Sequence, residues 1–203
     1  MRRILLAIAV WTFIISCNEK QTYTADDWQI GPFVKVDSLN PILGPQDTRW
    51  FCPMRQDTVA WEEKDVFNPC AVVKDGKVYM LYRAEDTVGK FNGTSRIGLA
   101  VSEDGLHFDR LPVPVFYPEP DEYTALEWEG GVEDPRIVED ENGTYYMTYT
   151  AYDGEKTRLC IATSEDLIVW RKHGVVFTNV DEELEKTLSF KSGLIVSNWL
   201  VIV

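Results

Sequence analysis

Two residues that precede proline, Asn68 and Asp134, offer the clearest chemistry in the sequence. An amide can bind hydroxyl groups, and a carboxyl group held in a pocket can act as a general acid. Asp134 lies in a run, 119–141, that holds ten acidic residues and a single basic one, Arg136. Like charges nearby favour the protonated form that a proton donor needs. The alternative is that Asp134 caps the turn before Pro135 and the acidic run is a solvated loop, and composition leaves both interpretations open.

An internal repeat indicates which elements must position these two residues. Residues 75–84 and 142–151 both contain a turn pair followed by an aromatic-rich strand, and residues 95–104 recur as 157–166. The copies are offset by about 62 to 67 residues, and each contains about four short strands separated by turns, without a long helical pattern. The sequence therefore predicts an all-β fold built from repeated four-stranded units.

Sequential four-stranded units at a fixed period are typical of a β-propeller, in which each blade buries its faces against its neighbours. A β-sandwich with similar strands is the alternative. Aligning Pro69 with Pro135 puts Asn68 and Asp134 at equivalent positions, near the start of the innermost strand of each unit. Since these strand starts surround a central channel, we expect the two side chains to face a common pocket.

Composition and charge exclude several functional classes. The 203 residues carry 33 acidic and 20 basic side chains, a formal net charge of −13 that disfavours binding to nucleic acid. A hydrophobic fraction of 45% is enough to bury a core, so the chain is expected to be globular. The four cysteines and two histidines lack the spacing of a metal site, so we expect neither a metal nor a cofactor. One disulfide among Cys52, Cys70 and Cys160 remains an option.

The first residues have the pattern of an export signal. Arg2 and Arg3 precede an apolar stretch, 4–15, which is followed by a serine and Cys17. This order resembles a bacterial lipobox, which predicts a lipoprotein signal peptide over 1–16 and lipidation of Cys17. An ordinary secretory signal is the alternative. Either interpretation predicts an exported protein, periplasmic or on the outer membrane, that reaches the membrane only through a lipid anchor.

The remainder divides into two predicted segments. Residues 17–65 are expected to form a tether and an N-terminal cap segment, because 18–27 are polar and 28–61 combine prolines and aromatic residues without helical periodicity. This pattern favours an irregular segment on the domain surface. Residues 66–203 are expected to form a partial β-propeller of about two units and the start of a third.

These motifs resemble glycoside hydrolase family 130. The segment 130–137, Gly-Gly-Val-Glu-Asp-Pro-Arg-Ile, is the most specific match, and 67–69, 81–86 and 158–164 support it. The resemblance covers about 28–193, including an N-terminal segment similar to that of secreted Bacteroidetes members. It implies a five-bladed β-propeller that cleaves β-mannosides with inversion, as a phosphorylase or as a hydrolase, so the expected partner is a β-mannoside oligosaccharide.

The resemblance also implies roles for individual residues. Asp134 matches the family's proton donor, which in phosphorylases is proposed to act through a sugar hydroxyl. Asn68 resembles a sugar-binding asparagine of the first blade, while Arg83 and Asp86 match a Tyr-Arg-Ala-x-Asp motif that lines the pocket. Lys191 is the candidate pocket residue of the third unit, and a surface lysine is the alternative interpretation.

Hydrolysis is favoured over phosphorolysis. Some phosphorylase branches carry an Asn-Arg pair soon after the Glu-Asp-Pro-Arg strand, whereas the stretch 152–156 has Asp153 and Gly154, which supply no fixed cation for phosphate. Export indicates the same, because recovery of a sugar phosphate suits an enzyme inside the cell. If the protein is a phosphorylase, inorganic phosphate is its co-substrate.

The length is short for this architecture. Five blades at this period need over about 300 residues. We therefore expect an N-terminal fragment that is inactive by itself, with the general base of an inverting hydrolysis on missing blades. The alternative function is that of a surface glycan-binding lipoprotein without catalysis, in which Trp50, Trp61 and Trp128 stack on sugar faces.

Overall fold

The computed structural model describes residues 32–177 with their side chains and the backbone of 193–196 and 199–202. The chain divides into two compact units, Met1–Val36 and Asp37–Val203. The helices and strands of the described residues all belong to the second unit. Part of the expected cap segment therefore belongs to the same compact unit as the strands that follow it.

Strands dominate the described residues, and the helices among them are short. They are a 3-10 helix, η1 (Asp37–Leu39), and a single turn of α-helix, α1 (Thr124–Glu127). The all-β class expected from the repeat is confirmed. In the part of the chain that the structure describes, we find no helix of the length and apolarity that crossing a membrane would require.

The first repeat is an antiparallel meander of four strands. These are β3 (Asp65–Lys74), β4 (Lys77–Glu85), β5 (Ser95–Ser102) and the two-residue β6 (Asp109–Arg110). Each strand pairs with the next along the chain. The turn pair recognised in the sequence, Asp75 and Gly76, connects β3 to β4. Lys74 and Lys77, on either side of this turn, are therefore the last paired residues of the two strands.

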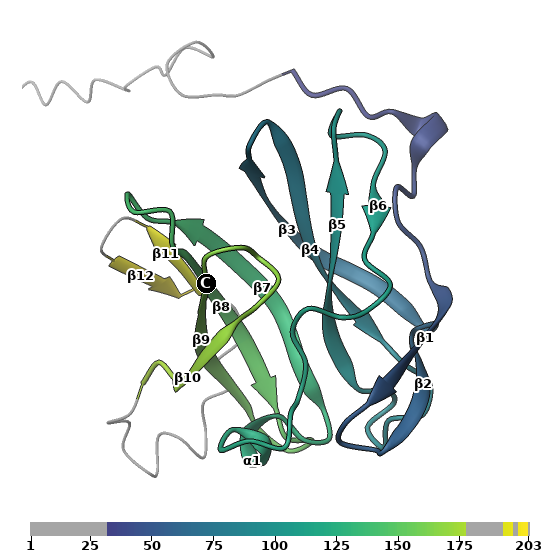
Figure 1. Cartoon of the computed structure of the whole chain (residues 1–203), viewed down its shortest axis with the longest axis vertical. Coiled ribbons are helices and arrows are strands. Elements are labelled where there is room, and N and C mark those ends of the chain that lie inside the picture. Colours follow the sequence, from purple (N-terminus) through teal and green to yellow (C-terminus); the bar gives the residue numbers. More distant parts are fainter. Residues whose placement is uncertain (1–31, 178–192, 197–198, 203) are drawn as a thin grey trace, which may run out of the picture. The chain divides into compact units, whose positions relative to one another are not determined.

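The second repeat has the same connectivity. Its strands are β7 (Gly131–Glu139), β8 (Tyr145–Tyr152), β9 (Thr157–Ser164) and β10 (Arg171–Val175), again paired in chain order. The two meanders meet where Ser95 pairs in parallel with Gly131, and β3 also lies against β7 (Figure 1). The equivalence of the two repeats, inferred from the sequence, is confirmed by their strand order.

The cap segment is more regular than expected. Residues 46–62 form a hairpin of β1 (Gln46–Cys52) and β2 (Asp57–Glu62), with a register shift between Gln46 and Arg49. The expectation of irregular structure was wrong here. The prolines that suggested it lie mostly before β1, and Pro53 lies in the turn between the two strands, where a missing N–H breaks no strand pairing.

Alternation along β4 and β5 lets these strands contribute to two cores. Leu81 and Leu99 enter a core shared with the second meander, while the adjacent Tyr82 and Ala100 face the hairpin. The core that contains Leu81 and Leu99 joins the two meanders, so it holds their inner strands at a fixed distance from each other. Its other buried members are Ile97, Val115, Phe116, Val132, Tyr145, Met147, Tyr149, Ala151, Cys160, Ala162 and Leu167.

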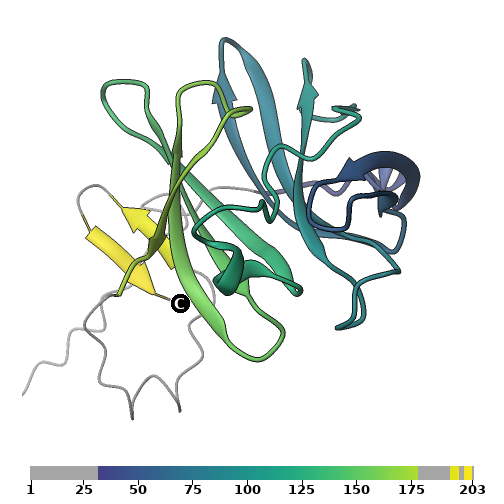
Figure 2. The ribbon, with the colours of Figure 1, turned by 60° about the horizontal axis from the view of Figure 1, so that its bottom comes forward.

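A further antiparallel hairpin follows the second meander. It consists of β11 (Gly193–Val196) and β12 (Trp199–Ile202), and β11 lies near β7 and β8. Figure 2 shows the two meanders from a second direction. Cys52, Cys70 and Cys160 are free thiols, so none of these three forms a disulfide with another.

Candidate active site

Asn68 and Asp134 occupy the same special backbone position in the two meanders. Each lies at a register irregularity of its inner strand, between Phe67 and Cys70 in β3 and between Glu133 and Arg136 in β7. Both residues have a positive φ, 45° for Asn68 and 50° for Asp134. Asparagine and aspartate adopt this left-handed conformation more readily than other non-glycine residues. The irregularity turns each side chain out of the regular in-and-out alternation of its strand.

The structure brings these two side chains together. Asn68 Nδ2 donates a hydrogen bond to Asp134 Oδ1 over 2.7 Å, and Arg83 Nη1 lies 3.2 Å from the same oxygen. Within the described residues, both hydrogen bonds to the Asp134 carboxylate reach Oδ1. Asp134 is 9% exposed, whereas Asn68 is exposed, so the pair reaches the surface on the Asn68 side. Among the described residues, none donates a hydrogen bond to Oδ2.

Arg83 is the centre of the charged cluster around Asp134. Its Nη2 donates to Glu85 Oε1 at 2.6 Å and to Glu133 Oε1 at 2.8 Å, and its Nε donates to Ser95 Oγ at 3.0 Å. The guanidinium lies over the ring of Phe67, 4.6 Å from its centroid. One cation thus holds three carboxylates, which is the fork geometry that arginine offers and lysine does not.

A second cation compensates part of the remaining negative charge of the cluster. Lys64 Nζ donates to Glu85 Oε2 at 2.7 Å, so the two oxygens of Glu85 bind two different cations. Burial opposes ionisation of Glu85, but the hydrogen bond from Lys64 and the charge of Arg83 outweigh it and hold the pKa of Glu85 below its ordinary value. Glu85 is therefore a permanent anion that anchors Arg83.

Sequence reasoning did not assign Lys64, Glu85, Ser95 or Glu133 to the site. Glu133 and Glu85 could have been assigned from the sequence. Glu133 directly precedes Asp134 in the Glu-Asp-Pro-Arg motif, and Glu85 lies inside the Tyr-Arg-Ala-x-Asp motif. The sequence around Lys64 does not indicate a role in the site, because Lys64 is brought to the cluster only by the pairing of the start of β3 with the end of β4.

Asp86 does not join this cluster, contrary to the expectation that it lines the pocket. It is completely buried, and its Oδ2 accepts a hydrogen bond at 2.8 Å from Arg96, which is also completely buried. Its Oδ1 accepts from the backbone N–H groups of Gly89 and Thr94. Asp86 follows the last residue of β4, so the strand alternation that directs Arg83 towards Asp134 no longer applies to it. Asp86 therefore shapes the β4–β5 loop.

Two predicted residues, Lys191 and Cys17, lie outside the described residues, and their roles stay predictions. Trp61, expected to be available for sugar stacking, has no exposed surface and stacks on Tyr82 inside the core beneath the hairpin. That expectation was wrong, because Trp61 faces the core that forms between the hairpin and β4. Trp50 packs edge-on against Tyr117.

The acidic run does not form one negative field around Asp134. Glu127 is buried and pairs with Lys172 over 2.6 Å, and Glu129 pairs with Arg55 of the hairpin. Among the ion pairs of the described residues, only Glu133 shares a cation of the cluster with Asp134 from within this run. The charges that contact Asp134 therefore come mainly from the first meander and not from its sequence neighbours.

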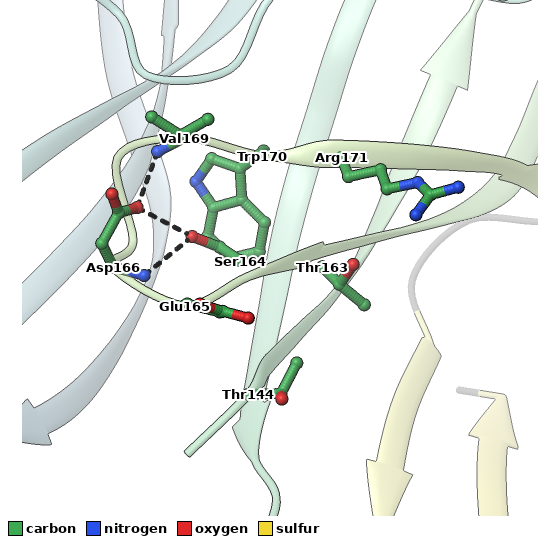
Figure 3. Close-up of a pocket in the computed structure, with 8 residues that line it drawn as sticks. All are labelled: Thr144, Thr163, Ser164, Glu165, Asp166, Val169, Trp170 and Arg171. Atoms are coloured by element: carbon green, nitrogen blue, oxygen red, sulfur yellow. Dashed lines mark hydrogen bonds between the residues drawn. The ribbon is translucent and has the colours of Figure 1, made fainter. Parts of the chain in front are cut away.

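Two cavities lie at opposite ends of the second meander. One, of about 280 Å³, lies beside the start of β7. The other, of about 390 Å³, lies at the far end, where Thr144 and Arg171 are part of its wall (Figure 3). There Ser164 and Asp166 close a turn by accepting backbone hydrogen bonds, and Ser102 and Asp104 do the same in the first meander. The far cavity thus surrounds a repeated structural turn and is separate from the Asp134 site.

No group of three metal-binding side chains lies together in the described part of the chain. His107 pairs with Asp104, and His173 contacts Thr163, both at turns or edges away from Asp134. The charged groups described around Asp134 are the carboxylates of Glu85 and Glu133 and the two cations that hold them.

The comparisons with known proteins agree with this geometry. A family model, described as beta-1,4-mannooligosaccharide phosphorylase, matches residues 45–199. The chain belongs to glycoside hydrolase family 130. The match includes the hairpin, both meanders and the Asn68, Arg83 and Asp134 cluster.

Relatives with curated activities match part of the chain. A 1,2-beta-oligomannan phosphorylase from Thermoanaerobacter sp. strain X514 is 39% identical over 131 residues, which are 61% of this chain and 42% of that protein. A beta-1,2-mannobiose phosphorylase from the same organism is 37% identical over 136 residues, with 61% and 43% coverage. The chain spans less than half the length of these two relatives.

Solved structures match over more of the chain. One, which is reported to show that this family of mannoside phosphorylases contains hydrolases that target β-1,2-mannosidic linkages in Candida mannan, is 46% identical with a TM-score of 0.76. It matches 87% of this chain and 51% of that one. A glycosyl hydrolase from Bacteroides ovatus is 42% identical over the same shares, also with a TM-score of 0.76. The chain spans about half the length of these structures.

Proposed function

We propose that the protein to which this chain belongs cleaves β-1,2-mannosides with inversion, and that Asp134 is the proton donor. The observation that carries this proposal is the carboxyl group of Asp134, held at Oδ1 by Asn68 and Arg83 within the Glu-Asp-Pro-Arg motif of family 130. The family description names a β-1,4 linkage, whereas the relatives and the structure with the stated activities act on β-1,2 linkages. We follow the latter, because they are defined at the level of single proteins.

The two hydrogen bonds favour one protonation site. An amide and a guanidinium both donate to Oδ1, so Oδ2 is the oxygen that can carry the proton to be transferred. Oδ2 can then donate its proton to the leaving oxygen, directly or through a sugar hydroxyl, and return to the carboxylate. Asn68, which is exposed beside it, can bind a hydroxyl group of the same sugar.

A second proposal concerns the fold of the whole protein. We propose that the two meanders are two adjacent blades of a five-bladed β-propeller, of which β11 and β12 begin a third. The half-length coverage of the solved structures supports this proposal. An inverting hydrolase needs a second carboxyl group roughly 6.5–9.5 Å from the acid to activate water. We propose that this base comes from the part of the relatives that the chain does not span, and that the 203-residue chain by itself is inactive.

Hydrolysis is the proposed reaction, since the two cations of the cluster around Asp134, Arg83 and Lys64, are already paired. Arg83 binds three carboxylates, Lys64 binds Glu85, and Arg158 pairs with Asp153 over 2.8 Å. Phosphate binding would have to displace these carboxylates, and like charge would oppose it. A phosphorylase would use inorganic phosphate as co-substrate and would release mannose 1-phosphate.

The experiment uses the protein that contains this chain, with β-1,2-mannobiose and β-1,4-mannobiose, each with and without inorganic phosphate. We expect release of mannose from the β-1,2 disaccharide without phosphate, and loss of turnover in Asp134→Asn with retained binding of the disaccharide. Strict dependence on phosphate would overturn hydrolysis, and preference for the β-1,4 disaccharide would overturn the linkage. Unchanged activity in Asp134→Asn would overturn the assignment of the acid, and binding of the disaccharide without turnover by the parent protein would favour a glycan-binding role.

We also propose that the protein is exported through the signal over 1–16 and anchored by lipid at Cys17. A soluble β-mannoside outside the cytoplasm would then meet the site without transport. Metabolic labelling with a fatty-acid probe, compared between the parent protein and Cys17→Ser, tests this proposal, because only the parent should carry the label.

A further inference from the structure

The cavity beside the start of β7 is built from three loops that meet near the Asp134 site. They are the β4–β5 loop, the segment just before β7 and the β8–β9 turn. Arg83 lies near the end of β4 and Asp134 near the start of β7, so all three loops lie at the end of the sheets where the charged cluster is found. The extended chain from Glu129 to Asp134 spans at most about 18 Å, within reach of one oligosaccharide.

The wall of this cavity combines aromatic rings with carboxylates. Its volume is about 280 Å³, and it is lined by Lys90, Phe91, Trp128, Glu129, Asp153 and Glu155. Aromatic rings offer flat apolar faces, and carboxylate oxygens accept hydrogen bonds from hydroxyl groups. Small-molecule sites commonly have this combination of apolar walls and a few polar groups that fix orientation.

The two rings are held in place by their surroundings. The guanidinium of Arg55, from the turn of the hairpin, lies 5.5 Å from the Trp128 ring centroid and also pairs with Glu129. Phe91 contacts Tyr152, and a Cβ at Gly154 would approach the Phe91 ring to 2.0 Å. Gly154 has a φ of 103°, so glycine here permits both the turn and the close approach of Phe91. A site arranged before binding loses less entropy when the ligand enters.

The charges of the wall are largely compensated. Arg55 pairs with Glu129, and Arg158 pairs with Asp153. Burial raises the pKa of Asp153, but the hydrogen bonds from Arg158 and from two backbone N–H groups outweigh it and bring that pKa below its ordinary value. Asp153 thus stays ionised as an acceptor, and the two ion pairs leave the cavity with little net charge. This suits a neutral ligand rich in hydroxyl groups.

We propose that this cavity is a subsite for a sugar residue of the oligosaccharide beyond the bond that is cleaved, with Phe91 and Trp128 as its stacking platform. The inference rests on the proposed function, since it takes Asp134 as the position of cleavage. It adds that the protein discriminates between oligosaccharides of different length. The β1–β2 hairpin contributes to this selectivity, because its Arg55 contacts Trp128 and pairs with Glu129.

The test compares kcat/KM for β-1,2-mannotetraose with kcat/KM for β-1,2-mannobiose in the protein that contains this chain. We expect the ratio to exceed one and to fall about tenfold in Phe91→Ala and in Trp128→Ala, the loss of one stacking contact. Phe51→Ala is the matched control, because Phe51 is an aromatic residue, 53% exposed, on the hairpin strand and outside this cavity. Its ratio should equal that of the parent.

Folding defects are separated by a third variant and a second measurement. Glu155 is exposed, so Glu155→Lys should fold and should lower the ratio by removing an acceptor. Calorimetric titration of β-1,2-mannotetraose into Asp134→Asn, alone and combined with Phe91→Ala, reports binding without turnover, and the second protein should bind about tenfold more weakly. A parent ratio near one, or unchanged ratios in the folded variants, overturns the subsite. Failure to cleave either sugar overturns the proposed function instead, and the titration still decides the subsite.

Discussion

Asn68 and Asp134 are joined by a hydrogen bond of 2.7 Å although they belong to different meanders. Each residue precedes a proline, has a positive φ and lies at the same irregularity of its inner strand. The contact is therefore one between equivalent positions of two copies, one of which carries an amide and the other a carboxyl group. The hydrogen bond between them therefore has a fixed donor, the amide nitrogen of Asn68, and a fixed acceptor, the carboxylate of Asp134.

Replacement of Asn68 tests the value of this contact. Asn68→Gly keeps the positive φ without strain and removes the amide. A hydrogen bond to a charged acceptor contributes about 1.5–3 kcal/mol, so kcat/KM for the β-1,2 disaccharide should fall roughly ten- to a hundredfold. Asn92→Gly, at another exposed residue with a positive φ, serves as the control and should retain activity. A variant at Asn68 with parental kinetics would contradict the orienting role.

Replacement of Arg83 tests the compensation of charge. Arg83→Met leaves Glu85, Glu133 and Asp134 without their common cation, and loss of one partner of a buried ion pair costs about 3–5 kcal/mol. The free energy of unfolding, measured by denaturant titration at pH 7, should fall by this amount. Arg83→Lys keeps the charge but loses the fork, and it should be intermediate. Equal stability of the methionine variant and the parent would rule out this account of the cluster.

Gly131 lies where the two meanders meet, and its substitution should disturb their contact. A Cβ at this position would lie 2.2 Å from the backbone oxygen of Ser95, and the residue has a φ of 112°. Gly76 has a φ of 77° but open space around it, so Gly76→Ala measures the conformational cost alone. We expect Gly131→Ala to destabilise the protein by roughly 1–3 kcal/mol more than Gly76→Ala. Similar losses at both positions, compared by thermal unfolding, would contradict close contact between Ser95 and Gly131.

Glu127 should make stability depend on pH. Burial raises the pKa of Glu127 to about 7, against the lowering effects of Lys172 and Tyr149, while an unperturbed glutamate titrates near 4.5. The folded state then binds more protons than the unfolded state between these values, so the free energy of unfolding falls as pH rises from 4.5 towards 7. The decrease is roughly 3 kcal/mol.

The Glu127→Gln variant has no carboxyl group at this position. Its free energy of unfolding should therefore lack this part of the pH dependence. Denaturant unfolding at several pH values in this interval provides the measurement. Glu119→Gln removes the same charge at an exposed residue and should keep the parental slope. A slope that persists in Glu127→Gln would assign the pH dependence to another group.

The strands were predictable because their signals are local. Turn pairs, alternating apolar residues and the recurrence of 75–84 in 142–151 specify two similar meanders before any contact is known. The hairpin at 46–62 was missed, since the prolines before it and in its turn suggested irregular structure, and the sequence did not show which face of the hairpin Trp61 would occupy. Side-chain direction in that segment depends on packing against β4, which local propensity does not encode.

By itself, the sequence determined the two copies, the equivalence of Asn68 and Asp134 and the family motif around them, because repetition and turn chemistry are written in neighbouring residues. Only the tertiary structure decided which charges surround Asp134. Arg83, Glu85 and Lys64 reach the site through strand pairing, Asp86 is directed to Arg96, and most of the acidic run pairs elsewhere or faces solvent. Ion pairing and burial depend on residues that are distant in the chain, so their outcome follows from packing and not from composition.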